Sequence, residues 1–161
     1  VERGAADVGV VGKDVLLETN PNVYELLDLQ LGKCTLSVAA RNGYVENPEV
    51  PLRVATKYPN VAREYYRRRN REIEIIKLNG SIELACLLGV SDVIVDIVET
   101  GATLRENDLQ VRELIAPSSA RLIANISRYP FKQQEISRMV NILSEVIGND
   151  KACLQQPDAA V

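Results

Sequence analysis

The sequence of 161 residues contains no histidine. Histidine is the side chain whose ordinary pKa lies closest to neutral pH, and it is the commonest metal ligand in proteins. Its absence excludes Ser-His and Cys-His nucleophile pairs. Any chemistry in this chain must therefore rest on carboxylates, hydroxyls, backbone amides, lysine and arginine.

Cysteine is scarce as well. The three cysteines, Cys34, Cys86 and Cys153, are far apart, and no pair has Cys-X-X-Cys spacing. This pattern argues against a disulfide framework and against a zinc site. We expect no set of side chains that binds a metal ion on its own. A reducing cytoplasmic setting is expected.

Long apolar runs and an excess of positive charge are also missing. No run approaches the ~20 apolar residues of a membrane-spanning helix, and the opening VERGAADVG has no signal-peptide pattern. The net charge is −3, which argues against a protein that binds nucleic acid by neutralising its phosphates. We therefore expect a cytoplasmic protein that binds neither membrane nor nucleic acid.

The sequence does contain an alternation of short apolar runs and helical patterns, which is typical of an α/β protein. Asn20-Pro21 reads as an N-cap followed by a first-turn proline, and Ser81 as the cap of a helix that Gly89 ends. Strands are predicted at residues 7–11, 34–40, 52–56, 73–78, 92–98, 111–115 and 121–126. Helices are predicted at residues 14–18, 22–29, 59–70, 81–89 and 131–148.

Two of these helices carry a further pattern. The last helix has one apolar stripe with helical spacing, formed by Ile136, Met139, Val140, Leu143, Val146 and Ile147. The helix at residues 59–70 ends in a basic cluster of Arg67, Arg68, Arg69 and Arg71. Because cations are favoured at helix C-termini and usually face water there, this cluster is expected to be solvated.

The clearest chemical signal lies in residues 96–104 (DIVETGATL), which we call the 96–104 loop. It follows a buried strand, and in α/β proteins the turn after such a strand lies at the sheet edge where ligands bind. Gly101 permits a tight turn and close approach of the backbone to a ligand. Thr100 and Thr103 add hydroxyls to the backbone amides of Gly101, Ala102 and Thr103. This concave set of donors suits a terminal phosphate.

Two acids flank these donors, Asp96 within the strand and Glu99 at its end. A carboxylate beside a phosphate is electrostatically unfavourable unless it has a role. It could accept hydrogen bonds from ribose hydroxyls, or it could contact Mg²⁺, which prefers oxygen ligands. The alternative is a polar loop after a core strand, and the short glycine motif by itself does not decide between the two.

The sequence around the loop, EIIKLNGSIELACLLGVSDVIVDIVETGATL, resembles the donor-binding region of ATP phosphoribosyltransferase, the first enzyme of histidine biosynthesis. The segments VERGAADVGVVGKDVL, LGKCTLSVA, RVATKYPNVAREYY and SSARLIAN also resemble blocks of that family, in the family's order. The resemblance extends from residue 1 to about residue 125.

This resemblance implies that the donor is 5-phosphoribosyl-1-pyrophosphate and that the acceptor is N1 of ATP, with pyrophosphate as the leaving group and Mg²⁺ assisting. Such a transfer depends on positioning and charge stabilisation and needs no histidine. The implied site residues are Thr100, Gly101, Ala102, Thr103 and Leu104 at the 5-phosphate; Asp96 and Glu99 as catalytic residues near the ribose; Glu83 facing the same cleft; and Gly12, Lys13 and Asp14 lining it from the opposing lobe.

The implied fold has two α/β lobes hinged as in type II periplasmic binding proteins, with the active site in the cleft between them. Lobe one would comprise residues 1–45 and 118–161, and lobe two, residues 46–117, would carry the 96–104 loop. Family members begin with a strand and a basic segment that this sequence does not show, so part of lobe one is expected to be missing.

The chain also resembles the short form of the family, because it ends soon after the helix at residues 131–148. Short forms resemble catalytic subunits that work with a separate regulatory partner related to histidyl-tRNA synthetase, and self-association is expected too. The chain departs from the family pattern at Cys86, where proline is usual, and at Asp108, where glycine is usual. Both positions lie outside the phosphate-binding residues.

Two other functions fit parts of the pattern. A non-catalytic solute-binding module of the same fold would show an export signal and no Thr-Gly-X-Thr donors, and the presence of those donors disfavours it. A type I phosphoribosyltransferase usually has two adjacent acids in its donor motif, whereas Asp96 is followed by Ile97.

Overall fold

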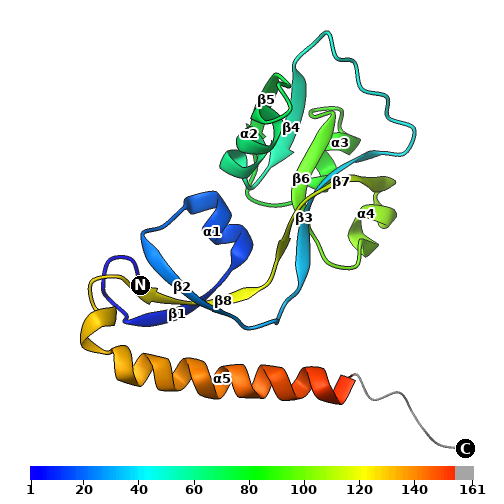
Figure 1. Cartoon of the computed structure of the whole chain (residues 1–161). Coiled ribbons are helices and arrows are strands. Elements are labelled where there is room, and N and C mark those ends of the chain that lie inside the picture. The colour runs from blue at the N-terminus through cyan, green and yellow to red at the C-terminus, as the bar shows by residue number, and fades with distance from the viewer. Residues whose placement is uncertain (155–161) are drawn as a thin grey trace, which may run out of the picture. The chain divides into compact units, whose positions relative to one another are not determined.

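The computed structural model describes residues 1–154 of the chain, and the side chains of residues 1–148. The chain forms two compact units. The first contains Val1–Lys13, Asn20–Gly32 and the chain from Ser119 on; the second contains Asp14–Thr19 and Lys33–Ser118. Each unit has its own sheet, and Figure 1 labels the elements of both.

The first unit is built on a three-stranded sheet in the order β1-β8-β2. Its strands are β1 (Val8–Gly12), β2 (Val23–Asp28) and β8 (Ala120–Asn125), and both outer strands run antiparallel to β8. The short 3-10 helix η1 (Tyr129–Phe131) and the long helix α5 (Gln133–Leu154) follow β8. Among the described side chains of this unit, the buried apolar ones are Leu122, Ile123, Ala124 and Ile136.

Residues 22–29 contain strand β2, so the helix predicted there is wrong. Asn20 has φ +43°, which is not the extended conformation of a helix N-cap. The apolar residues of this segment fit the period of a helix as well as that of a strand. Pairing with β8, in which Val23 lies opposite Asn125, decides in favour of the strand. Local sequence could not show this because the pairing partner lies far along the chain.

The second unit is built on a five-stranded sheet in the order β5-β4-β6-β3-β7. Strand β4 runs parallel to β5 and β6, and β3 runs antiparallel to β6 and β7. The strands are β3 (Cys34–Arg41), β4 (Leu52–Thr56), β5 (Ile73–Lys77), β6 (Val93–Val98) and β7 (Leu109–Ser118). The helices are α1 (Lys13–Thr19, whose first residue belongs to the first unit), α2 (Pro59–Arg67), α3 (Glu83–Leu87) and α4 (Ala102–Glu106).

This sheet is covered on both faces, as the β-branched run in β6 predicts. Val93 and Val95 point to one face, where they pack with Ala62, Tyr65 and Tyr66 of α2. Ile94 points to the other face, where the core residues include Ile82, Ala85, Cys86 and Leu104 from around α3 and α4. The alternation of side chains along β6 therefore separates an α2 face from an α3–α4 face.

The helix ends partly agree with the sequence. The prediction that Ser81 caps α3 is wrong, because Ser81 has φ +50° and Ile82 occupies the cap position without a side-chain hydrogen bond. Gly89 ends the helix as predicted. Its φ of +69° and the bond from Val90 N to Ala85 O, 2.9 Å long, are typical of a glycine-terminated helix.

The boundary between the units differs from the expected lobes. Residues 14–19, 33–45 and 118 belong to the second unit instead of the first. Strand β3 belongs there because it lies between β6 and β7 in the larger sheet. Cys34 and Cys86 are free thiols, and the side chain of Cys153 lies outside the described part. None of the described helices is long and apolar enough to cross a membrane.

Candidate functional site

The 96–104 loop leaves β6 at the edge where β4 also ends. Because β4 and β6 are parallel and Thr56 lies opposite Val95, the residues after both strands emerge on the same side. Lys57 follows β4, and Asp96 is the next residue of β6 after Val95. Strand β5 ends at this edge too, since it is parallel to β4. This is the edge at which α/β sheets bind ligands.

Thr56 fixes the turn after β4 against β6. Its side chain is fully buried, and its hydroxyl donates a 2.6 Å hydrogen bond to the carbonyl of Val95. The same oxygen accepts a 2.8 Å bond from the amide of Tyr58. Thr56 thereby holds Lys57 and Tyr58 at the edge. This role could not be predicted from the sequence, because the bonds depend on the pairing of two distant strands.

Asp96 is a half-buried carboxylate in a largely acidic neighbourhood. Burial raises its pKa, as do the nearby charges of Glu83 and Asp14, while a hydrogen bond from the amide of Ile97 and the charge of Lys57 lower it. The raised pKa indicates that the burial effect prevails. The second unit therefore brings together three of the predicted site residues, Asp14, Glu83 and Asp96, with Lys57 as a neighbouring cation.

Asp14 is held in place by two hydroxyls of its own unit. Tyr58 donates a 2.8 Å hydrogen bond to its Oδ2, and Ser118 donates a 2.9 Å bond to its Oδ1. Ser118 Oγ also accepts a 3.0 Å bond from the Asp14 amide. Burial, followed by this hydrogen bond, raises the pKa of Tyr58. Tyr58 and Ser118 are site residues that the sequence did not reveal, since both act through Asp14.

The predicted residues Gly12 and Lys13 belong to the first unit, whereas the 96–104 loop belongs to the second. The Lys13 ammonium pairs with Glu25 Oε2 at 2.6 Å. Its backbone amide donates a 3.0 Å hydrogen bond to the carbonyl of Ser119. Lys13 is thus anchored within its own unit by both its side chain and its backbone.

Gly101 gives the loop its sharp turn. Its φ is +71° and its ψ is 12°, a left-handed conformation that glycine adopts without the penalty of a side chain. A Cβ at this position would lie 3.3 Å from the Arg105 guanidinium, itself hydrogen-bonded to the carbonyl of Thr100 at 3.1 Å. Arg105 is a further loop residue that the sequence did not single out.

The remaining donors of the loop face solvent. Thr100, Ala102 and Thr103 are exposed, whereas Leu104 is buried and anchors α4 in the core. The first amides of a helix have no partner within the helix, and the Ala102 amide makes only a long, 3.4 Å bond to Thr100 Oγ1. A solvent-facing group of hydroxyls and amides next to a half-buried acid can bind an anion with adjoining hydroxyl groups.

Glu99 is exposed, and its charge contributes to the raised pKa of Cys34, which burial dominates. A thiol with a raised pKa is largely protonated and is not a nucleophile at neutral pH. Among the described residues, no group of three acidic or cysteine side chains is arranged to hold a metal ion on its own.

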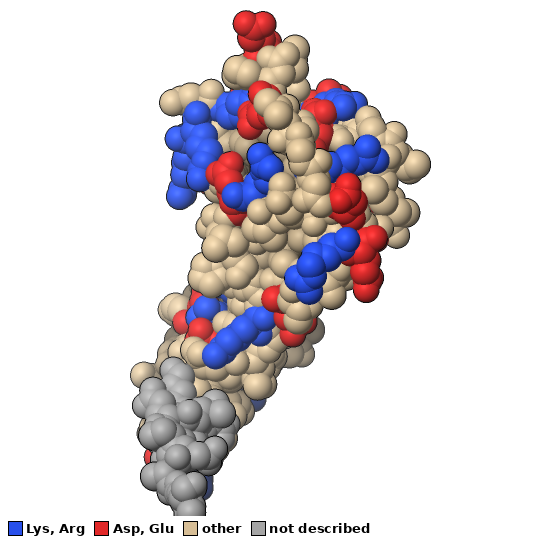
Figure 2. All heavy atoms as spheres, turned by 90° about the vertical axis from the view of Figure 1, so that its right-hand side faces the viewer, with Lys and Arg blue, Asp and Glu red and all other residues tan. Residues whose placement is uncertain are grey.

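The basic cluster is solvated only in part. Arg67 and Arg68 are exposed as predicted and pair with Glu64. Arg71 is not solvated: its side chain is 15% exposed, pairs with Glu46 at 2.6 Å and binds three carbonyls of residues 47–50. On the described part of the face in Figure 2, basic and acidic side chains are interspersed over much of the surface.

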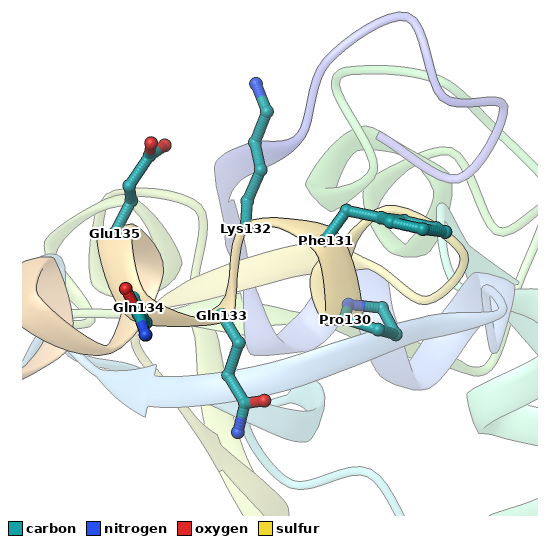
Figure 3. A pocket seen from close by; sticks show the side chains of 6 residues that line it. All are labelled: Pro130, Phe131, Lys132, Gln133, Gln134 and Glu135. Carbon is teal, nitrogen blue, oxygen red and sulfur yellow. The ribbon is translucent and has the colours of Figure 1, made fainter.

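A hollow in the first unit makes a poor candidate site. It is lined by residues 130–135, and Figure 3 shows Lys132 and Gln133 pointing to opposite sides. The Lys132 ammonium is already bound to Asp7 at 2.7 Å. Because binding sites need convergent polar groups, the sheet edge beside the 96–104 loop is the stronger candidate.

Comparison with known proteins identifies the family of this chain. The family model described as ATP phosphoribosyltransferase matches residues 1–145. An ATP phosphoribosyltransferase of Brachyspira hyodysenteriae is 58% identical over 148 residues, covering 91% of this chain and 72% of that protein. One of Alkaliphilus metalliredigens is 53% identical over 148 residues, covering 92% of this chain and 71% of that protein.

Solved structures are similar to this chain as well. A chain of the ATP phosphoribosyl transferase (HisG:HisZ) complex from Thermotoga maritima has a TM-score of 0.82 and 36% identity, covering 91% of this chain and 73% of that one. The substrate binding protein of an amino acid ABC transporter has a TM-score of 0.62 at 15% identity, covering 94% of this chain and 68% of that one. The second likeness concerns the fold alone and confirms the type II periplasmic-binding-protein-like class.

The family match settles the choice between the catalytic and the solute-binding alternatives. Relatives with 50% identity or more over about nine-tenths of the chain share the name of one enzyme. The family model spans the 96–104 loop and the residues around it. This chain belongs to the ATP phosphoribosyltransferase family, whose pentosyl transfer is the first step of histidine biosynthesis.

Proposed function

We propose that the 96–104 loop binds the 5-phosphate and ribose of 5-phosphoribosyl-1-pyrophosphate, and that ATP is the acceptor. The observation that carries this proposal is the position of Gly101. Its left-handed turn leaves Thr100 and Thr103 exposed shortly after β6, the strand that carries the half-buried Asp96. Hydrogen bonds to a charged acceptor contribute about 1.5–3 kcal/mol each, so a few suffice for a phosphate in an acidic protein.

Asp96 and Glu99 are the proposed catalytic residues at the ribose end. As carboxylates they accept hydrogen bonds from the ribose hydroxyls and stabilise the positive charge that develops at carbon 1 as pyrophosphate leaves. Asp14 and Glu83 add negative charge to the same neighbourhood, as their effect on the pKa of Asp96 indicates. Lys57 supplies a counter-charge from the end of β4.

The oxygen donors at this edge also fit Mg²⁺. Magnesium is usually held by one or two carboxylates together with substrate phosphates, not by a full set of protein ligands. Asp96 and Glu99 are the residues that would hold it alongside the donor's pyrophosphate. When bound, the ion neutralises charge on that leaving group.

We further propose that the chain self-associates and works in a hetero-oligomer with a regulatory subunit related to histidyl-tRNA synthetase. The support is its similarity to a chain of the HisG:HisZ complex. Native mass spectrometry of the chain, alone and mixed with such a subunit, tests this. A mixed species is expected, and persistence of two separate populations at micromolar concentration would contradict it.

The donor site is tested by hydrogen exchange of the full chain with and without Mg²⁺ and 5-phosphoribosyl-1-pyrophosphate. Protection is expected in peptides that cover residues 96–104. Residues 133–148 of α5 provide the internal control and should exchange at the same rate in both samples. Protection confined to segments outside residues 96–104 would refute the assignment.

A further inference from the structure

The second unit contains another hollow, of about 250 Å³, away from the 96–104 loop. Its lining includes Tyr44, Tyr66 and Arg112, with Glu46, Glu113 and Val93 around them. Tyr66 and Val93 belong to the core on the α2 face of the sheet. The 96–104 loop follows the opposite end of β6, and its Leu104 packs on the other face. The hollow therefore differs from the proposed donor site in both sheet face and strand end.

Tyr66 presents a hydroxyl that has no hydrogen-bond partner among the described residues and is not fully enclosed by protein. The residue is 4% exposed, and its ring packs edge-on against Tyr65 at a centroid distance of 5.2 Å. No hydrogen bond joins the Tyr66 hydroxyl to any of the described residues, and its oxygen keeps some exposure, so a ligand in the hollow can reach it. Burial raises its pKa, so at neutral pH this hydroxyl is protonated and can donate a hydrogen bond.

Arg112 is the cation of this hollow whose charge is not matched within the described part of the chain. Its guanidinium makes one long hydrogen bond, 3.3 Å, to the carbonyl of Tyr44. The two acids of the lining are engaged: Glu46 pairs with Arg71 at 2.6 Å, and Glu113 pairs with Arg69 at 3.3 Å. Tyr65 also donates a hydrogen bond to Glu113. The charge of Arg112 is therefore available to pair with one negative charge on a ligand.

We propose that this hollow binds the carboxylate of a small organic anion, with Arg112 and Tyr66 as its hydrogen-bond donors. The planar guanidinium matches the two oxygens of a carboxylate. A dianion such as phosphate is disfavoured, because Glu46 and Glu113 also line the hollow. The volume falls below the roughly 300–1,000 Å³ of pockets for drug-sized ligands, which limits the ligand to about the size of an amino acid.

The test is an amide-resolved NMR titration of the full chain with acetate, at constant ionic strength. Saturable shifts are expected at Tyr44 and Glu113. The affinity should fall about tenfold in Tyr66→Phe and in Arg112→Gln, since each loses a hydrogen bond to a charged group. Arg63→Gln, which removes an exposed arginine of α2 that does not line the hollow, serves as the control and should bind as the original chain does.

Two further probes define the ligand. Glycine binding more tightly than acetate would support the proposal and identify an amino acid, because its ammonium can approach Glu46 or Glu113. Acetate binding as tightly as glycine would support a simple carboxylic acid. Inorganic phosphate saturating these amides while acetate does not would overturn the proposal. So would shifts that do not saturate, or an affinity unchanged in both variants.

Discussion

The hydroxyl of Tyr58 donates a 2.8 Å hydrogen bond to Oδ2 of Asp14, joining the turn after β4 to the helix α1. Tyr58 is almost completely buried, so the bond is shielded from water. It fixes one of the acids that surround Asp96. Through this contact Tyr58 sets the position of a site carboxylate.

Replacing Tyr58 with phenylalanine should therefore destabilise the second unit. The loss is expected to be about 1.5–3 kcal/mol, the usual contribution of a hydrogen bond to a charged group. Urea unfolding measures it, with Tyr129→Phe as a control in the first unit. An unfolding free energy equal to that of the original chain would show that water replaces the hydroxyl at no cost.

Thr56→Val should show how the turn after β4 is held. Valine keeps the shape of threonine but removes the bonds to Val95 and Tyr58, leaving a buried carbonyl and amide without this partner. A loss of about 1–3 kcal/mol is expected. Thr19→Val, at an exposed residue whose hydroxyl bonds only within its helix, should change stability far less. Equal losses from the two substitutions would contradict the role given to Thr56.

Asp96 should lower stability at neutral pH. Because its pKa is raised in the folded chain, the folded state holds this proton more tightly than the unfolded state does. Its contribution is therefore most favourable below the ordinary value of 3.8 and is lost as the pH rises through the raised pKa. Asp96→Asn should accordingly stabilise the chain at pH 7 relative to the original, and this gain should vanish near pH 3.

Asp92→Asn is the matched comparison, and its effect on stability at pH 7 should have the opposite sign. Arg53 lowers the pKa of Asp92 through hydrogen bonds, one of them 2.6 Å long. That contribution is present above the ordinary value of 3.8 and is lost as the pH falls through the lowered pKa, so Asp92→Asn should destabilise the chain at pH 7. Thermal unfolding of both variants between pH 3 and pH 7 separates the two effects. A loss of stability in Asp96→Asn at pH 7 would refute the argument from burial.

Substitution of Asp96 or Glu99 should lower the turnover rate more than substitution of Arg68. Asp96→Asn and Glu99→Gln are expected to lower the rate at saturating ATP and Mg²⁺ by tenfold or more, because each removes charge that stabilises the transition state. Arg68→Ala should have little effect, since Arg68 is exposed and pairs only with Glu64. Steady-state assays of the assembled enzyme measure the ranking. Arg68→Ala as the most damaging variant would place the substrate phosphates elsewhere.

The sequence predicted most of the second unit because its elements carry local signals. The β-branched run of Val93, Ile94 and Val95 specifies a strand buried on both faces whatever surrounds it. Gly101 likewise signals its turn locally, since few other residues adopt φ +71° without strain. Fold class and loop could be predicted for this reason.

Long-range contacts explain why some features of the structure could not be predicted from the sequence. Strand β2 exists because β8 pairs with it, and its own residues also fit a helix. Ser118 lies 104 residues from Asp14, whose carboxylate it binds, and Arg71 organises a loop more than 20 residues before it. These roles appear only when folding brings the partners together, so periodicity and spacing cannot reveal them.

Two glycines test whether the 96–104 loop binds the phosphoribosyl donor. Gly101 and Gly43 have nearly the same left-handed backbone, with φ +71° and +76°, so alanine strains the backbone similarly at both; at Gly101 its Cβ would also lie 3.3 Å from the flexible Arg105 guanidinium. Calorimetric titration of each variant with 5-phosphoribosyl-1-pyrophosphate and Mg²⁺ should show affinity at least tenfold weaker for Gly101→Ala and unchanged for Gly43→Ala. Unchanged affinity in Gly101→Ala, or equal losses in both variants, would contradict the assignment.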